Sequence, residues 1–448
     1  MGVRAGWAIG WVMLAASASA ASAQISLASA VNLALSNDTQ VRMREAAVQK
    51  AEAELKATRD VYIPSIEASL GYGEGVGVPT ALPTVVSLTT QSLVFNFSQR
   101  DNIRAAASGL EAAKLSLEDT RSQIEQDVAT TYLNLDSDQR KLKVMDQEVG
   151  DADRLATIAQ ERLDAGEDTR MDLLKAQRTA AQIQLNKMDL QDDIASLSDH
   201  LSRLIGLRDD QIITVESSIP AVPAVEVSPS IKNQPDSAAI QAAMDSARSK
   251  QELAFGESRY LLRPEFTFGM NYTRIDTSQN AYTTYYPAFL NKSENAISLY
   301  LTMNLPIYDR QHKDQSKGAA AEARRAYFES ESQREQFLEG RKKLRRNAAE
   351  LAARSNLAGL DQAIAQEQVK VIETQLNSSS SASQQPMTPE DEQRARMEEE
   401  ARTLDLLDSE YQLQQSRLNL LEQTGGLQLW LRNAAALSEG LPTGALNH

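Results

Sequence analysis

The chain has 448 residues, enough for two or three ordinary domains, and its low aromatic content of 5% favours long helices over compact α/β cores. A net charge of −15 argues against nucleic-acid binding, because the chain would not neutralise phosphates. The absence of cysteine excludes disulfides, thiol catalysis and cysteine-ligated metals, so we also expect no lipid anchor on an N-terminal cysteine.

The N-terminus is typical of a secretory signal. Arg4 precedes an apolar run from Trp7 to Ala16, and small residues then lead to Ala23, after which we expect Sec-type cleavage. The run is too short to span a bilayer, and the rest of the chain has no stretch of roughly 18 consecutive apolar residues. The sequence therefore predicts a signal peptide over residues 1–23 and no transmembrane helix after it.

Two stretches far apart in the chain follow one pattern: RDVYIPSIEASLGYG begins at Arg59 and RYLLRPEFTFGMNYT begins at Arg259. In each, helix-forming residues end at a proline, Pro64 or Pro264, which lacks a backbone donor and favours an extended conformation before it. Period-two apolar alternation follows, as in a strand with one apolar face. We predict helices over residues 26–60 and 236–261, and strands over residues 64–75, 86–98, 264–276 and 295–308.

The predicted strands are about ten residues long, near the length of a tilted membrane strand. Soluble, half-buried hairpins are the alternative, but the export signal favours the outer membrane. Four strands cannot close a membrane barrel, and open edges are not tolerated in lipid, so several chains would have to combine their strands. Two chains would give eight strands and three would give twelve; the pattern alone does not choose.

Long proline-free segments follow the strand pairs. Leu110, Leu117, Ile124 and Val128 in the first segment keep the three-four spacing of a coiled-coil seam, and a helix of that length would span on the order of 95 Å. We predict helices over residues 100–163, 168–205, 311–376 and 390–431.

The two halves indicate an internal duplication. DLLKAQRTAAQIQLN, which begins at Asp172, matches DLLDSEYQLQQSRLN, which begins at Asp405. The second half would then carry insertions, including a Ser-rich one over residues 377–400. We assign a first repeat to residues 24–216, a proline-rich linker to 217–236, a second repeat to 237–431 and a disordered tail to 432–448.

Four features together resemble the TolC-type outer-membrane efflux proteins: the duplicated layout, YIPSIEASLGY, the exit LTMNLPIYDRQHKDQSKGAAAEARRA and the turn RLDAGEDTRMDLLKAQ. The resemblance covers residues 24–431 and implies a mainly α fold with membrane β-structure. Three chains would share a 12-stranded outer-membrane barrel, which continues into a periplasmic α-barrel tunnel of coiled-coil helices. The implied function is a passive exit duct of a tripartite efflux or type I secretion system. A periplasmic adaptor and an inner-membrane pump would be its partners, and it would need no cofactor or metal.

The resemblance also implies functional positions. Pro64, Pro264 and Pro306 would mark the switch between helix and strand, and the first helix turn would contact the adaptor through Gly166, Thr169, Asp172 and Leu173. TLDLLD from Thr403 matches the second turn, where Asp405 and Asp408 would form an acidic ring at the periplasmic aperture. The alternatives are ordinary surface acids and a plain helix-loop-helix turn, in which Gly166 ends one helix and Thr169 caps the next.

A periplasmic adaptor and an enzyme are the two alternative function classes. A periplasmic adaptor, or another coiled-coil structural protein of an export system, also uses long helical hairpins, but the β-rich flanks of an adaptor are absent here. An enzyme is not expected, because the histidines His200, His312 and His448 are scattered and no catalytic motif is present.

Overall fold

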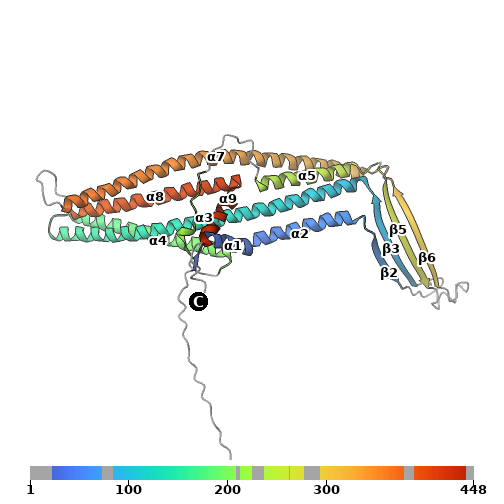
Figure 1. Ribbon diagram of the computed structural model, residues 1–448, viewed down its shortest axis with the longest axis horizontal. Coiled ribbons are helices and arrows are strands. Elements are labelled where there is room, and N and C mark those ends of the chain that lie inside the picture. The colour runs from blue at the N-terminus through green and yellow to red at the C-terminus, as the bar shows by residue number, and fades with distance from the viewer. Residues whose placement is uncertain are drawn as a thin grey trace, which may run out of the picture. The chain divides into compact units, whose positions relative to one another are not determined.

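The computed structural model describes residues 23–72, 84–207, 212–224, 237–261, 263–276, 293–377 and 388–439 (Figure 1). The predicted signal peptide up to residue 22 lies outside these residues, as do most of the predicted linker, most of the Ser-rich insertion before residue 388, and residues 440–448 of the predicted tail. No described helix is both long and apolar enough to cross a membrane.

The chain forms two compact units. The sheet unit contains residues 39–121 and 230–342, and the hairpin unit contains residues 1–38, 122–229 and 343–448. The two longest helices, α3 (Phe97–Asp164) and α7 (Arg310–Asn377), contribute residues to both units. Each unit is described below by itself.

Four antiparallel strands form the sheet of the sheet unit, in the order β2-β3-β5-β6. Their bounds are β2 Ser65–Gly71, β3 Thr84–Phe95, β5 Glu265–Asp276 and β6 Ser293–Asn304. Helix α2 (Thr39–Asp60) precedes β2, and α5 (Ala238–Ser258) precedes β5. Pro64 and Pro264 each stand immediately before a strand, so the helix-to-strand change lies where the sequence predicted it.

The strand register places most apolar residues of the four strands on one face. Ala68 pairs with Leu88, Leu88 with Tyr272, and Tyr272 with Ile297. The other face carries polar side chains such as Ser69, whose Oγ lies 2.6 Å from that of Ser87. On the outer strands the apolar side chains are largely exposed, with exposed fractions of 78% for Ile66 and 67% for Leu299. The sheet therefore presents a continuous apolar face that the chain itself does not cover on these strands.

The long helices form two pairs of matching length. Helices α3 and α7 each have 68 residues, and α4 (Arg170–Ile205) and α8 (Pro389–Thr424) each have 36. Both of the shorter helices end at a glycine with positive φ, Gly206 or Gly425, a left-handed conformation that favours glycine.

In the hairpin unit, a small core of polar and apolar residues surrounds Tyr132 of α3. The Tyr132 side chain is fully buried. Two short strands, β1 (Ala23–Ile25) and β4 (Ile212–Thr214), pair in parallel, and the Tyr132 hydroxyl donates to the Ile25 carbonyl at 2.7 Å. Helix α1 (Leu27–Asn37) packs against α4, and Asn37 Nδ2 donates to the Ile205 carbonyl at 2.8 Å. Helix α9 (Leu427–Glu439) adds Trp430, whose Nε1 donates to the Pro220 carbonyl at 3.2 Å.

Several predicted boundaries are corrected by these elements. Residues 432–439 are helical in α9 and not a disordered tail, because Leu431 and Ala434 are buried in the hairpin unit. The predicted first helix is divided at Asp38, which ends α1 in an extended conformation. Strand β6 ends at Asn304, so Pro306 lies in the connection to α7 and not within a strand.

Candidate functional site at the helix turns

The first helix turn connects α3 to α4 through the segment Ala165–Thr169. Gly166 has φ +77°, and its N–H donates to the Leu163 carbonyl at 3.0 Å, while the Glu167 N–H donates to the Arg162 carbonyl at 2.9 Å. These bonds satisfy carbonyls at the end of α3 that have no partner within the helix. Gly166 thus acts as a helix-ending residue.

Thr169 and Asp172 form a capping box at the start of α4. The Asp172 N–H donates to Thr169 Oγ1 at 3.4 Å, and the Thr169 N–H donates to Asp172 Oδ2 at 3.4 Å. The Thr169 hydroxyl also donates to Asp172 at 2.6 Å, and Lys175 Nζ donates to it at 3.2 Å. These bonds favour the charged carboxylate, so the Thr169 hydroxyl, followed by Lys175, lowers the pKa of Asp172.

The second helix turn repeats this chemistry at Thr388 and Asp391. Pro389 occupies the first position of α8, and the Asp391 N–H donates to Thr388 Oγ1 at 3.3 Å. The Thr388 N–H donates to Asp391 Oδ2 at 2.9 Å, which with the Thr388 hydroxyl lowers the pKa of that carboxyl. Thr-Pro-Glu-Asp is a capping signature visible in the sequence, with proline at its preferred place, so this helix start could have been found from the sequence alone.

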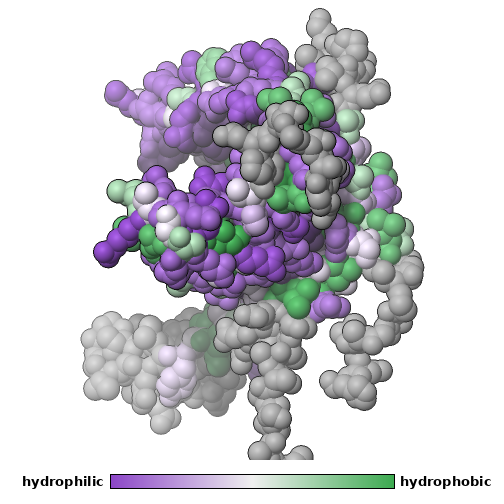
Figure 2. Space-filling model, turned by 90° about the vertical axis from the view of Figure 1, so that its left-hand side faces the viewer, coloured by the Kyte–Doolittle hydropathy of each residue, from purple (hydrophilic) through white to green (hydrophobic). Residues whose placement is uncertain are grey.

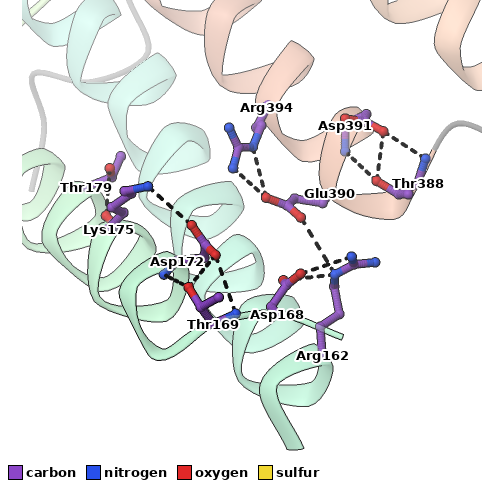
Figure 3. A network of polar contacts seen from close by, with 10 residues as sticks. All are labelled: Arg162, Asp168, Thr169, Asp172, Lys175, Thr179, Thr388, Glu390, Asp391 and Arg394. Atoms are coloured by element: carbon purple, nitrogen blue, oxygen red, sulfur yellow. Dashed lines mark hydrogen bonds and ion pairs between the residues drawn. The ribbon is translucent and has the colours of Figure 1, made fainter. Parts of the chain in front are cut away.

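Arg162 connects the two turns (Figure 3). Its guanidinium donates two parallel bonds to Asp168, from Nε to Oδ2 at 2.9 Å and from Nη2 to Oδ1 at 3.0 Å. Its Nη1 lies 3.4 Å from Glu167 Oε2, and its Nε lies 3.8 Å from Glu390 Oε2 on α8. Glu390 in turn accepts from Arg394 Nε at 3.1 Å. The Asp168 bonds raise the pKa of Arg162, so this cation stays charged and joins three carboxylates from the two turns.

An apolar cluster lies next to this polar network. Leu155 and Ala159 of α3 pack with Leu173 and Ala176 of α4, and Met397 of α8 lies against them. Leu173 is only 8% exposed, so the predicted adaptor contact at this residue is wrong: the side chain faces the interior of its own chain. The neighbouring side chains Met171 and Leu174, 61% and 50% exposed, are available to a partner.

The end of the hairpin unit that carries the turns is mainly hydrophilic on its surface, with smaller apolar areas (Figure 2). Gly166, Thr169 and Asp172 lie on this surface. The turns therefore offer a polar, charged rim with a few exposed apolar side chains, which is the composition of a docking surface more than of a catalytic pocket. Among the described residues, no group of three or more His, Asp or Glu side chains is arranged to hold a metal ion.

Asp405 and Asp408 do not lie at the second turn. Both belong to the middle of α8, whose first residue is Pro389. Asp405 Oδ2 lies 3.5 Å from Arg402 Nη1, and Asp408 forms an ion pair with Lys141 of α3. The predicted placement of these two acids at the turn is therefore wrong, because the match between the two DLL motifs aligned similar leucine spacings in two different parts of the helices.

Comparison with known proteins gives one family match and a shared fold. Residues 30–207 match the model of the family described as outer membrane efflux protein. Among curated proteins, no sequence matches the chain. Solved structures of outer-membrane channels share the fold at low sequence identity.

Three of these structures illustrate the likeness. The Campylobacter jejuni CmeC outer membrane channel is 14% identical, with a TM-score of 0.72 over 93% of this chain and 90% of that one. The outer membrane protein VceC of Vibrio cholerae is 16% identical, with a TM-score of 0.69 over 89% and 96% of the two chains. The open state of the Neisseria gonorrhoeae MtrE outer membrane channel is 13% identical, with a TM-score of 0.67 over 90% and 89%.

Proposed function

Because residues 30–207 match the outer membrane efflux protein family, we propose that this chain is an outer-membrane export channel that acts as a passive exit duct. Three copies form the duct, each contributes four strands to a 12-stranded barrel, and their helices continue as a tunnel in the periplasm. A periplasmic adaptor docks at the helix turns, and an inner-membrane transporter supplies the energy. The system is a tripartite efflux or type I secretion system, and the chain itself performs no chemistry.

The open sheet is the observation that carries this proposal. Strands β2 and β6 are the two edges of the sheet, and their apolar side chains Ile66, Leu70, Ile297 and Leu301 have exposed fractions between 66% and 78%. In water such a face would aggregate, and in lipid its unpaired edges would cost several kcal/mol for each unsatisfied backbone group. Closure with strands from further copies removes both costs, and it turns the apolar face toward lipid.

Exposed apolar stripes on two helices support assembly from several copies. On α7, Leu357, Leu360, Ile364 and Val371 are each more than half exposed, at spacings of three, four and seven residues. On α4, Met171, Leu174, Leu185 and Met188 form a second exposed stripe with the same three-residue steps. Such spacing is that of a coiled-coil seam, so these stripes fit against a neighbouring copy.

Oligomeric mass tests the assembly. We expect the purified protein in detergent to have the mass of three chains, and we expect the double variant Leu360→Glu with Ile364→Glu to lose that state, because two carboxylates would be buried in an apolar seam. Asn347→Glu, which adds a charge at an exposed polar position of the same helix, should remain trimeric. A wild-type protein with the mass of a single chain would contradict the proposed duct.

A further inference from the structure

A cavity of about 680 Å³ lies among helices α3, α7 and α8 within the hairpin unit. Asp151 of α3 lines it together with Arg396, Glu399 and Glu400 of α8, and α7 contributes the uncharged side chains Gln362 and Gln366. The proposed duct assigns no role to this cavity.

Glu400 meets another carboxyl group in this cavity. Its side chain forms a hydrogen bond with Asp151, which is only 8% exposed. One oxygen of Glu400, Oε2, is sealed from solvent and has no hydrogen-bond partner among the described residues. Because an ionised carboxylate only accepts hydrogen bonds, a bond between two carboxyl groups requires that they hold a proton.

The nearby cations are bound to other acids. Arg396 donates to Glu373 of α7 at 3.0 Å and to Glu392 at 2.7 Å, and Arg154 lies 3.2 Å from Asp151. The charged groups that face the cavity or interact with its lining are Asp146, Glu148, Asp151 and Arg154 on α3, Lys187 on α4, Lys370 and Glu373 on α7, and Glu392, Arg396 and Glu399 on α8. Acids outnumber bases in this set, so an ionised Glu400 would be surrounded mainly by other negative charges.

Burial and the neighbouring acids oppose the ionisation of Glu400. Burial raises the pKa of Glu400 to about 8, and the charges of Asp151 and Glu148 act in the same direction. Burial also raises the pKa of Glu148, one turn before Asp151 on α3. The proton is therefore held at neutral pH, and it is lost as the pH rises through about 8.

We propose that Glu400 and Asp151 form a proton-dependent clamp between α8 and α3. With the proton bound, one carboxyl donates to the other and joins the two helices across the cavity. When the proton leaves to water, two carboxylates face each other and the contact between α3 and α8 loosens. The clamp goes beyond the proposed duct and does not depend on it, since it concerns two helices of a single chain.

Infrared spectroscopy of the purified full-length protein tests the proton directly, because a protonated carboxyl and a carboxylate absorb at different frequencies. We expect the wild-type protein to lose a protonated-carboxyl band with a midpoint near pH 8. Glu400→Gln, which keeps the shape and cannot ionise, should lack this step. Glu398→Gln, which removes an exposed carboxylate of the same helix, should keep it. Absence of the step in the wild-type protein, or its persistence in Glu400→Gln, would overturn the clamp.

A second measurement tests the movement. The chain has no cysteine, so spin labels on Asp153→Cys in α3 and Ala401→Cys in α8, in labelled chains diluted with an excess of unlabelled ones, report the distance between these two exposed positions. We expect longer distances to gain population as the pH rises through about 8, and we expect no such change when Glu400→Gln is added. Distances that stay constant while the infrared step occurs would show that the proton does not hold the helices together, and the clamp would be abandoned.

Discussion

Replacing Arg259 with Met is expected to lower the local free energy of opening of the sheet unit by about 3–5 kcal/mol. Arg259 Nη1 lies 2.9 Å from Asp101 Oδ2 and 3.2 Å from Oδ1, and Asp101 is only 1% exposed at the start of α3. Loss of Arg259 leaves a buried carboxylate whose other cation, Arg104, is a more distant partner at 3.4 Å. Hydrogen exchange of peptides from the start of α3 and the end of α5 measures this loss.

The size of the loss distinguishes the closely paired cation, Arg259, from the more distant one, Arg104. Arg104→Met removes one contact at 3.4 Å from a half-exposed side chain, whereas Arg259 makes two contacts at 2.9 and 3.2 Å, so Arg104→Met should cost at most about 1 kcal/mol. Asp101→Asn combined with Arg259→Met should recover much of the loss, because no buried charge then lacks a partner. If Arg104→Met and Arg259→Met had equal effects, the pair between Asp101 and Arg259 would not be the stabilising one.

Tyr132→Phe is expected to destabilise the two short strands of the hairpin unit, β1 and β4. The hydroxyl donates to the Ile25 carbonyl at 2.7 Å and accepts from the Val215 N–H at 2.8 Å, and the ring is fully buried. Phenylalanine keeps the ring but leaves both backbone groups without this partner, at a cost of about 1–3 kcal/mol for each group that stays unsatisfied.

Exchange of the amides of β1 and β4 reports the effect of Tyr132→Phe. Both strands should exchange faster, while most of α3 should keep its protection because its packing is unchanged. Tyr327→Phe removes a hydroxyl from a side chain that is 55% exposed and serves as the control. Unchanged protection of β1 and β4 in Tyr132→Phe would mean that strand pairing alone holds them.

Long periodic elements were predictable from the sequence for a clear reason. The helix predicted over residues 100–163 is α3, Phe97–Asp164, because an uninterrupted seam without proline specifies a helix over its whole length. The strands after Pro64 and Pro264 begin within one residue of the predicted start, because proline fixes where the helix must end.

The alignment of the two halves was not predictable in the same way. The caps Thr169 and Thr388 begin α4 and α8, so the helix starts align Asp172 with Asp391, whereas the leucine pattern aligned Asp172 with Asp405. The step from Asp391 to Asp405 is two heptads, and a heptad pattern matches itself at such a shift. Helix ends, where capping chemistry is local and specific, would have given the better reference points, and they would have kept Asp405 away from the turn.

Features formed by distant residues left no pattern in the sequence. Strands β1 and β4 have three residues each, too few for a period, and the bond from Tyr132 to Ile25 joins parts of the chain that are far apart in sequence. The carboxyl pair of Asp151 and Glu400 likewise depends on the packing of α3 against α8. Neither could be read from spacing within one element.

Single-channel conductance in a planar lipid bilayer tests the export duct most directly. We expect long-lived openings of one unit size from the wild-type protein. We expect more frequent openings from Arg162→Ser, because this substitution removes the cation that joins the two helix turns. Arg170→Ser removes an equal charge from an exposed position beside the first turn and should behave as the wild-type protein does. Bilayers that contain inserted protein but show no openings, either for the wild-type protein or for Arg162→Ser, would contradict the account.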